Sequence, residues 1–443
     1  MAQGAREDPH PARPEHELIR REPIPRGRRP PLRFPAGAGI VLDGAAGSGQ
    51  MGASVFTVPP MSVTRSELVS LRVVFFLNGL GIAVWFPRIP DVKAALGLDV
   101  LTLAFCLFGL PLGTILGFLT VSRLTTRIGL KAATIWGGAA FLLSFIGPAL
   151  AWNAPSLAVT LLLSGLCIAL IEVAMNAKAS QTEAASGRRI MTGCHAFWSF
   201  GSVSGALLGG AFAQGGFSFL SQQLIVQPIF ALATIWFGYR LLADAPRTEE
   251  ARRGGGFALP SAALLLLCMV PIGALLAEGA MMEWSALLLR EHVGASPFAT
   301  AAVFSIFALA MAGMRLAGDR LAELFGARRV ILVSGVVMGV SILGFGLSPS
   351  LWLSAPSALL VGVGCANIYP LTMSMVAPLP GQAPEKNVAT LALTSFTAFL
   401  IGPPFIGIVA SVAGLPVALA LLAPLGAVPL LMPRSRERAP TGA

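Results

Sequence analysis

The stretch IALIEVAMNAKAS, residues 168–180, holds a carboxylate and an amide inside an otherwise apolar run. Glu172 and Asn176 are four residues apart, so on a helix they share one face. A charged side chain at the centre of a helix in a bilayer costs about 2.5–3.5 kcal/mol, so it needs a partner, a water-filled cavity or a proton. Glu172 and Asn176 are therefore candidates for binding a polar solute, and Glu172 also for holding a proton.

His195 and Trp198 begin the next apolar segment, at a depth similar to that of Glu172. A carboxylate that faces an imidazole in a low-dielectric site can pass a proton near neutral pH. Two interpretations of a Glu172–His195 pair remain open: it couples proton movement, or it is an interhelical hydrogen bond that only sets the packing. Trp198 lies away from either predicted membrane interface, which favours stacking on a ring-shaped solute.

Two further acids lie within one apolar run, at Glu278 and Glu283. Glu278 is near the middle of the run, so we expect it to line a cavity, to bind solute and to take part in proton coupling. Trp284 is a further candidate for solute binding. Glu283 lies closer to the predicted membrane interface and is expected to be a solvated or rim residue.

The composition requires a membrane. Hydrophobic residues make up 55% of the 443 residues and charged residues only 12%, and the mean hydropathy is +0.76. The net charge of +10 lies in short breaks between apolar runs of about 20 residues, the length that one helix needs to cross a bilayer. The charge is therefore a topology signal and does not indicate nucleic acid.

Motifs for enzymatic or metal chemistry are missing from the sequence. The five cysteines show no CxxC or Cys/His spacing suited to a metal. There is no GxxxxGK[ST], GxSxG or HExxH motif, so we expect no cofactor, no enzyme activity and no use of ATP.

The apolar runs predict an all-α integral membrane protein with twelve transmembrane helices in two six-helix halves. The predicted spans are about 68–88, 99–121, 131–152, 156–178, 191–212, 219–242, 262–287, 297–318, 327–348, 351–377, 387–410 and 412–432. Basic residues cluster in alternate breaks, including Lys178 and Arg315, whereas the opposite breaks hold only Arg88, Lys93 and Arg290. By the positive-inside rule both termini are expected in the cytoplasm.

The remaining segments predict the domain organisation. Residues 1–60 are rich in Arg, Pro and Gly, so a disordered cytoplasmic tail is expected; the alternative is that translation starts at Met61. The halves are predicted at 61–242 and 261–433, with a cytoplasmic linker at 243–260 and a cytoplasmic tail at 434–443.

A repeat supports this division. SRLTTRIGLKAATI, residues 122–135, aligns with DRLAELFGARRVIL, residues 319–332, and places Gly129 opposite Gly326. The same offset of 197 residues pairs other glycines and places Tyr369 opposite Glu172. A duplicated six-helix unit follows, as in many transporters. Small residues every fourth position, Gly201, Gly205 and Gly209, predict close packing of that helix, and two interpretations remain open: a sliding contact with a neighbour in the other half, or simple tight packing.

Two six-helix halves with a basic, glycine-containing loop after the second helix of each resemble the major facilitator superfamily. The loop motif of that family, Gly-x-Leu-x-Asp-Arg-x-Gly-Arg-Lys, is matched in part by SRLTTRIGLK and DRLAELFGAR, although Ser122 and Thr126 replace its Gly and Asp. The resemblance assigns a conformational role to these loops at Arg123, Arg127, Gly129, Asp319, Arg320 and Gly326. GIAVWFPRIPDVKAALGL, IEVAMNAKA and EGAMMEWSALLLREHVGAS resemble its YbjJ/MosC-like subgroup, with the fucose permeases as distant relatives.

The resemblance also implies a site and an activity. In that family the first, fourth, seventh and tenth helices line a central cavity, which adds Asn78, Asn367 and Tyr369 to the predicted solute-binding residues. Tyr369 precedes Pro370, which frees backbone groups that suit a cavity lining; the alternative is a plain proline kink. The arginine that drug/proton antiporters carry before the glycine of the fourth helix is absent here, since Leu161, Leu162 and Leu163 precede Ser164 and Gly165, and this disfavours efflux.

The resulting prediction is a proton-coupled symporter of the bacterial inner membrane. It would move a small polar organic solute, sugar- or cyclitol-like, by alternating access, as a monomer in the lipid bilayer. The alternatives are efflux of a small metabolite or drug, and a membrane sensor or scaffold without flux.

Overall fold

The computed structural model describes residues 63–244, 261–380 and 384–432, and every regular element in these ranges is a helix. The predicted tails at 1–60 and 434–443 and all but two residues of the predicted linker lie outside the described residues. The elements are α1 (Arg65–Ala83), η1 (Phe86–Arg88), α2 (Ile89–Ala95), α3 (Val100–Leu107), α4 (Gly109–Ile128), α5 (Leu130–Ser144), α6 (Ile146–Ala149), α7 (Ala154–Ser186), α8 (Met191–Gln214), α9 (Phe219–Gly238), α10 (Ala262–Met269), α11 (Ile272–Glu283), α12 (Ser285–Glu291), α13 (Pro297–Phe325), α14 (Ala327–Gly346), α15 (Leu351–Cys365), α16 (Ile368–Val376), α17 (Pro384–Ala413), α18 (Leu415–Ala420) and η3 (Ala423–Leu431).

The described residues contain eleven helical segments long and apolar enough to cross a membrane, and a shorter apolar segment, Leu415–Leu431, falls on the twelfth predicted span. Several spans are interrupted helices. The predicted span 262–287 is divided into α10, α11 and the start of α12, and 351–377 is divided into α15 and α16. The fold is therefore the predicted all-α membrane fold, with more breaks at membrane depth than the hydropathy indicates.

Local sequence signals set the helix ends. Thr64 accepts a hydrogen bond from the backbone N–H of Glu67, whose side chain caps the backbone of Thr64 in return. Asn153 begins α7 in the same manner with Ser156. Such caps satisfy backbone donors that have no partner within the first turn of a helix.

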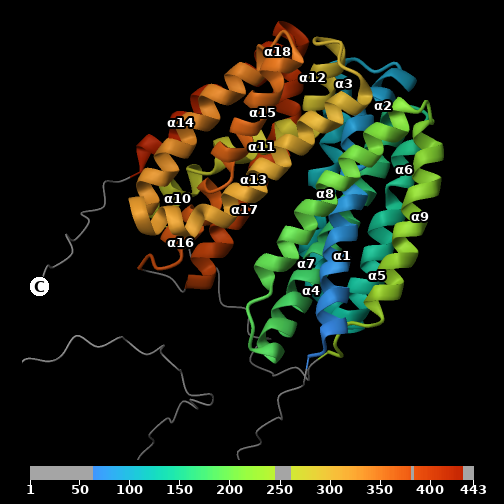
Figure 1. Cartoon of the computed structure of the whole chain (residues 1–443), viewed down its shortest axis with the longest axis vertical. Coiled ribbons are helices and arrows are strands. Elements are labelled where there is room, and N and C mark those ends of the chain that lie inside the picture. Colours follow the sequence, from blue (N-terminus) through green and yellow to red (C-terminus); the bar gives the residue numbers. More distant parts are fainter. Residues whose placement is uncertain (1–62, 245–260, 381–383, 433–443) are drawn as a thin grey trace, which may run out of the picture. The chain divides into compact units, whose positions relative to one another are not determined.

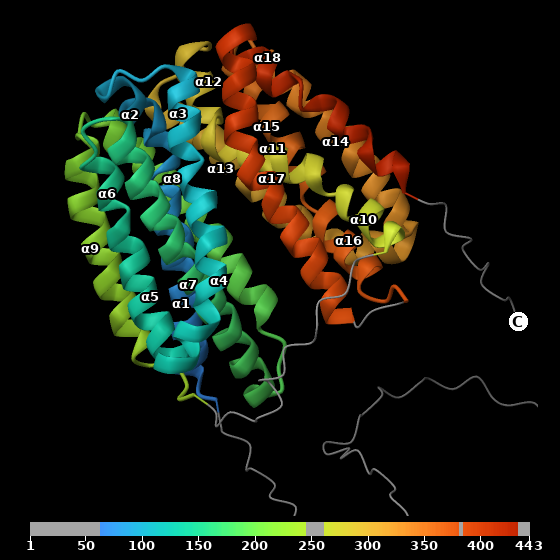
Figure 2. The ribbon, with the colours of Figure 1, turned by 180° about the vertical axis from the view of Figure 1, so that it is seen from behind.

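The helices divide by packing. The most extensive helix contacts include α1 with α8 and α4 with α7, and later in the chain α14 with α15 and α13 with α15. Figures 1 and 2 show α1–α9, in blue to green, beside α10–η3, in yellow to red. Contact between the two sets runs mainly through α8 against α13 and α3 against α17.

Positions 197 residues apart adopt matching conformations. Gly129 and Gly326 have φ values of 86° and 83°, and Gly97 and Gly294 have 62° and 69°. These values are unfavourable for residues with a Cβ. The sequence repeat is thus a structural one, which fits two pseudo-symmetric halves.

Helix packing repeats with the same offset. A Cβ added to Gly165 would overlap the carbonyl oxygen of Leu110, and a Cβ added to Gly362 would overlap that of Phe307. Adding 197 to both residue numbers of the first contact gives the second, so the halves share helix crossings as well as loops.

The structure decides between the two interpretations of the glycine stripe of α8, Gly201, Gly205 and Gly209. A Cβ on Gly201 or Gly205 would overlap backbone atoms of Phe76 or Leu80, which belong to α1. The stripe therefore packs α8 within its own half, and Gly210, which approaches Ala301 of α13, is the glycine that meets the other half.

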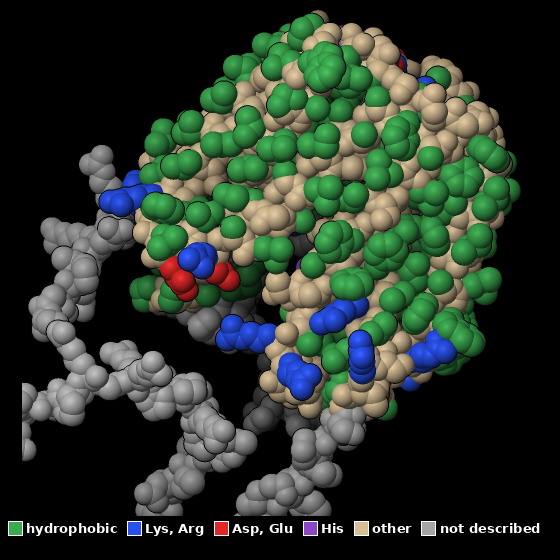
Figure 3. Space-filling model, viewed as in Figure 1, with side chains coloured by type: hydrophobic (Ala, Val, Ile, Leu, Met, Phe, Trp, Pro, Cys, Tyr) green, Lys and Arg blue, Asp and Glu red, His purple; other side chains and the backbone are tan. Residues whose placement is uncertain are grey.

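The surface separates into apolar and basic regions. Large apolar side chains such as Leu119, Trp136 and Val340 are more than half exposed along the helices. Figure 3 shows hydrophobic side chains over most of the visible face, with Lys and Arg gathered at the lower end, where α4 and α7 end. This distribution suits a bilayer around the helices. We call that lower end the linker end and the opposite end, where α2 and α12 lie, the gate end.

Candidate functional site

A hydrogen bond between α1 and α8 joins two of the predicted residues. Trp198 Nε1 donates to Asn78 Oδ1 at 2.8 Å, and Asn78 is buried. The bond satisfies an indole N–H and an amide oxygen that a membrane interior cannot solvate. Asn78 and Trp198 thus form one unit.

Glu172 and Asn176 also form a unit, within one turn of α7. Asn176 Nδ2 donates to the carbonyl oxygen of Glu172 at 2.8 Å and to Glu172 Oε2 at 3.2 Å. His195 instead packs its ring edge-on against Phe75, with centroids 5.5 Å apart. Among the described residues no hydrogen bond or ion pair joins Glu172 to His195, so the expected contact between them is absent from this conformation.

Glu278 is paired with Arg315, which the sequence had placed among the basic residues of a break although it also falls near the end of the predicted span 297–318. Arg315 lies within α13 and places Nη2 3.4 Å from both carboxylate oxygens of Glu278. Its Nε donates to the carbonyl oxygen of Ala366 at 3.4 Å. That carbonyl has no helical donor because the residue four positions later is Pro370.

The break between α15 and α16 provides hydrogen-bond partners for α13. The Tyr369–Pro370 sequence predicted the break but not these partners. Asn367, at the break, donates from Nδ2 to the carbonyl oxygen of Met314 at 3.1 Å. Tyr369 packs partly buried against the apolar core. Ala366 and Asn367 together anchor two neighbouring residues of α13, Met314 and Arg315.

A cleft of about 300 Å³ lies between α8 and α13. His195 and Arg315 line it from opposite halves. Its other lining residues are Thr192, Ala196, Ser199, Phe200, Leu309, Ala312, Gly313 and Leu316. Figure 3 shows the surface hollowed below the contact of α8 with α13. The volume is at the lower end of the range for small-molecule sites.

Trp284 lies elsewhere. Its side chain is fully buried at the junction of α11 and α12, and it lines none of the described cavities. Its indole N–H has no hydrogen-bond partner among the described residues. In this conformation Trp284 packs in the core and does not face the cleft.

A second ion-pair network, at the linker end, includes another residue that the sequence had assigned to a break. Lys178 is fully buried in α7 and forms an ion pair with Asp244 at 2.8 Å. Asp244 also accepts from the backbone N–H of Lys131, at the start of α5. Partial burial raises the pKa of Asp244, but the hydrogen bonds from Lys178 and Lys131 outweigh it and hold the pKa below its usual range.

The predicted conformational loops lie at the same end. Arg123, Arg127, Asp319 and Arg320 are exposed in the last turns of α4 and α13. A Cβ on Gly129 would lie 2.5 Å from Asp244 Oδ2. Gly129 therefore leaves room for the network.

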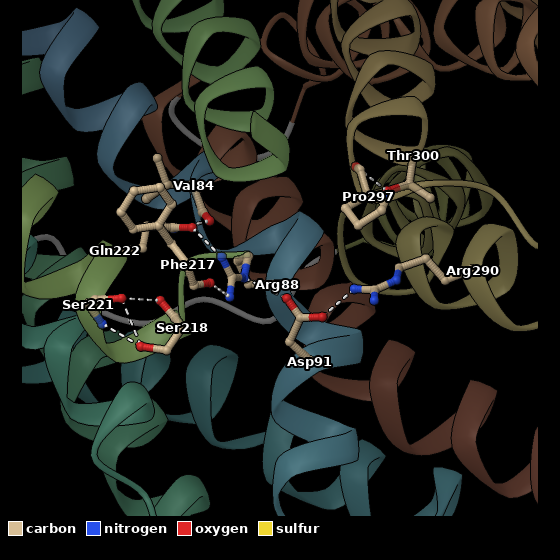
Figure 4. Close-up of polar contacts among 10 residues, drawn as sticks. All are labelled: Val84, Arg88, Asp91, Phe217, Ser218, Ser221, Gln222, Arg290, Pro297 and Thr300. Carbon is tan, nitrogen blue, oxygen red and sulfur yellow. Dashed lines mark hydrogen bonds and ion pairs between the residues drawn. The ribbon is translucent and has the colours of Figure 1, made fainter. Parts of the chain in front are cut away.

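Charged residues across the gate end were not predicted as site residues. Arg88 Nε lies 2.6 Å from Asp91 Oδ2, and Asp91 also pairs with Arg290 on α12 (Figure 4). Lys93 pairs with Glu291 at 2.6 Å. We call Asp91, Lys93, Arg290 and Glu291 the gate pairs, because each ion pair joins α2 to α12.

Arg88 supports the gate from inside the first half. It donates from Nη1 to Gln222 Oε1 and from Nη2 to the carbonyl oxygen of Phe217, both at 2.9 Å (Figure 4). Gln222 is itself buried and donates to the carbonyl oxygen of Val84. Arg88 is thus held in place with its charge directed at Asp91. In the sequence, the closely spaced charges of PRIPDVK and LREH could have indicated these ion pairs. That the two segments face each other is shown only by the tertiary structure.

Comparison with known proteins agrees with this architecture. The family model of the Major Facilitator Superfamily matches residues 267–442. An uncharacterized MFS-type transporter of Yersinia pestis is 31% identical over 364 residues, covering 81% of this chain and 92% of that protein. The membrane protein MosC of Rhizobium meliloti is 26% identical over 359 residues, covering 80% of this chain and 86% of MosC.

A solved structure shows the same fold. The crystal structure of a D-xylose-proton symporter superposes with a TM-score of 0.67 at 13% identity and covers 83% of this chain and 97% of the symporter. The fold, the interrupted helices and the relatives at this level of identity together place the chain in one family: it belongs to the major facilitator superfamily of membrane transporters.

Proposed function

We propose that this protein is a secondary active transporter that moves a small polar organic solute, sugar- or cyclitol-like, by alternating access coupled to protons. The observation that carries the proposal is the cleft between α8 and α13, where His195 of one half and Arg315 of the other line one space. A solute bound there touches both halves, so its presence can affect how they move relative to each other.

The polar residues around the cleft suit a polyhydroxylated solute. Arg315 offers several N–H donors to hydroxyl oxygens, and Ser199 and Thr192 add hydroxyl groups. We also assign solute binding to the Asn78–Trp198 and Glu172–Asn176 units and, in the second half, to Asn367 and Tyr369, none of which lines the cleft in this conformation. Trp284 would reach solute only after a rearrangement of α11 and α12.

Proton coupling is assigned to Glu172, His195 and Glu278. Glu278 is held by Arg315 at 3.4 Å, a distance long enough for a solute to compete for the guanidinium. A proton on Glu278 would release Arg315 to the solute. Glu172 has only Asn176 as a hydrogen-bond partner among the described side chains, so it too can exchange a proton.

The two ends of the molecule support alternating access. The gate pairs join α2 to α12, whereas none of the other ion pairs of the described residues, Arg88–Asp91, Lys178–Asp244 and Arg315–Glu278, joins the two halves. With the positive-inside rule, the linker end and both termini are assigned to the cytoplasm and the gate end to the exterior of an inner membrane. The protein would act as a monomer in two halves, 61–242 and 261–433.

A thermal shift experiment tests ligand binding. The purified full-length protein is melted in detergent with D-xylose, myo-inositol and glucosamine as probes. A ligand at about 100 times its Kd stabilises the folded state by about 2.7 kcal/mol, and Arg315→Ala removes that shift whereas Arg329→Ala, an exposed arginine, keeps it. A sensor or scaffold with no solute site shows no shift with any probe.

Flux in proteoliposomes tests the mechanism. With the probe that shifts the melting temperature, an imposed proton gradient should drive accumulation in the wild type, and Glu172→Gln or Glu278→Gln should lower it. If both variants keep full proton-driven flux, the coupling mechanism is wrong. Transport only in the opposite direction would favour efflux, the second candidate, for which the apolar lining at Phe200, Leu309 and Leu316 is the supporting observation.

A further inference from the structure

Glu283 is a carboxyl group that the mechanism above leaves unused. It is the last residue of α11 and lines a cavity of about 10 Å³ between α11 and α17. The other lining residues are apolar or glycine: Leu275, Leu276, Gly279, Ala280, Ala398, Phe399, Gly402, Pro403 and Ile406. The structure thus surrounds Glu283 with apolar groups, whereas the sequence led us to expect a solvated or rim position.

Two glycines keep the helices close around this cavity. A Cβ on Gly279 would lie 3.3 Å from Phe399 Cδ1, and a Cβ on Gly402 would lie 3.4 Å from Leu276 Cδ2. The approach leaves space for about one water molecule. Glu283 is half-buried, and the small space beside its side chain is lined by apolar groups.

Glu283 has no charged or hydrogen-bonding partner among the described residues. From Val388 onward α17 carries no charged residue, and neither do α15 and η3. The charged residues on the other elements packed against α11 are Arg290 and Glu291 on α12, Arg315, Asp319, Arg320 and Glu323 on α13, and Arg328 and Arg329 on α14. Within the described part of the chain none of them forms an ion pair or a hydrogen bond with Glu283. An unpaired carboxylate in such surroundings costs several kcal/mol, so the neutral, protonated acid is the stable form.

The facing helix offers acceptors for that proton. Pro403 and Pro404 lie inside α17 and lack N–H groups, so the carbonyl oxygens of Phe399 and Leu400 lose their helical donors. Phe399 itself lines the cavity. A protonated carboxyl is a donor, directly or through one water, and matches acceptors of this kind. A cation such as Ca²⁺ takes about 6–8 oxygen ligands, more than this cavity supplies.

We propose that Glu283 is a further proton-binding site, which holds its proton while the gate end is closed. Glu283 is joined through Trp284 to α12, whose Arg290 and Glu291 form the gate pairs. Opening of the gate shifts α12 and the end of α11, admits water to the carboxyl and lets the proton leave to the solvent. The role of this proton in transport rests on the proposed function, whereas the presence of the proton on Glu283 can be tested without any solute.

Infrared difference spectroscopy tests the site without any solute. The full-length protein in lipid is compared at acid and alkaline pH, and the wild type should lose the C=O band of a protonated carboxylic acid in apolar surroundings. Glu283→Gln should lack the component of that band that comes from Glu283, whereas the matched variants Glu172→Gln and Glu278→Gln should keep that component. Equal bands in wild type and Glu283→Gln, or no such band in the wild type, would overturn the proposal.

The gate supplies a second readout. Spin labels at the exposed positions 95 and 292, on α2 and just after α12, report the width of the gate end in a background without the native cysteines. The width should depend on pH in the wild type and lose this dependence in Glu283→Gln. If Glu283→Gln does not fold, Glu283→Asp should retain an acid band at a shifted frequency; an unshifted band would place the proton elsewhere. If the infrared and spin-label results are as expected but no solute flux is found, the transport proposal is rejected and the proton site at Glu283 is not.

Discussion

At the scale of single residues, Arg315 shows how charge is misassigned when spans are drawn from hydropathy. It stands near the end of an apolar run, where a basic residue normally marks a cytoplasmic loop. The structure extends α13 to Phe325 and holds Arg315 between Glu278 and the carbonyl oxygen of Ala366. Lys178 is the parallel case, since Asp244 compensates its buried charge.

The Lys178–Asp244 pair makes stability depend on pH. The pKa of Asp244 is lower in the folded protein than its unfolded value of about 3.9. Its contribution is therefore complete above that unfolded value and is lost as the pH falls through the folded pKa. Asp244→Asn should destabilise the protein by about 1–3 kcal/mol at neutral pH, with the lower part expected because Asp244 is partly exposed.

Thermal melting of wild type and Asp244→Asn across a range of pH measures this effect. The gap between the two melting temperatures should narrow in the acid range. Glu323→Gln removes an exposed carboxylate and should melt like the wild type at every pH. A gap that stays constant on acidification would contradict the assignment to Asp244.

At the scale of elements, glycine sets how closely helices approach. Gly201 packs against the backbone of α1, whereas a Cβ on Gly313 of α13 meets no atom within 4 Å. Gly201→Ala should cost about 1–3 kcal/mol through overpacking. Gly313→Ala should be neutral or stabilising by up to about 1 kcal/mol, because alanine favours the helix.

Both variants are melted under identical conditions. Because each replaces a helical glycine by alanine, the gain in helix propensity is the same, and the difference between their melting temperatures reports the cost of packing. Equal melting temperatures would show that α1 and α8 move apart at little cost. The sequence predicted the stripe Gly201, Gly205 and Gly209 but not its partner, since a small-residue spacing specifies close contact without specifying with what.

At the scale of the whole molecule, the gate pairs hold the two halves together at one end. Each is an exposed or partly exposed ion pair, worth about 0.2–1 kcal/mol. Lys93→Glu sets two carboxylates against each other and should shift the population toward an open gate end. The double variant Lys93→Glu with Glu291→Lys restores opposite charges and should return it.

The spin-label pair at positions 95 and 292 measures this shift as a longer distance in the single reversal. High salt should reduce the difference between the variants, because exposed charges are screened. A double variant as open as the single one would mean that the Lys93–Glu291 pair does not hold the gate.

The sequence by itself determined the membrane class, the run of spans and the duplication at an offset of 197. Those properties follow from hydropathy, spacing and glycine positions along the chain, which are local signals. Asn176 beside Glu172 was likewise predictable, because four residues on a helix define a contact. The tertiary structure decided the rest: Arg315 against Glu278, Asp91 against Arg290, and the isolation of Glu283 between α11 and α17. Each of these depends on which distant helices meet, and in a bilayer almost any pairing of apolar helices buries the same kind of surface, so hydropathy cannot choose between them.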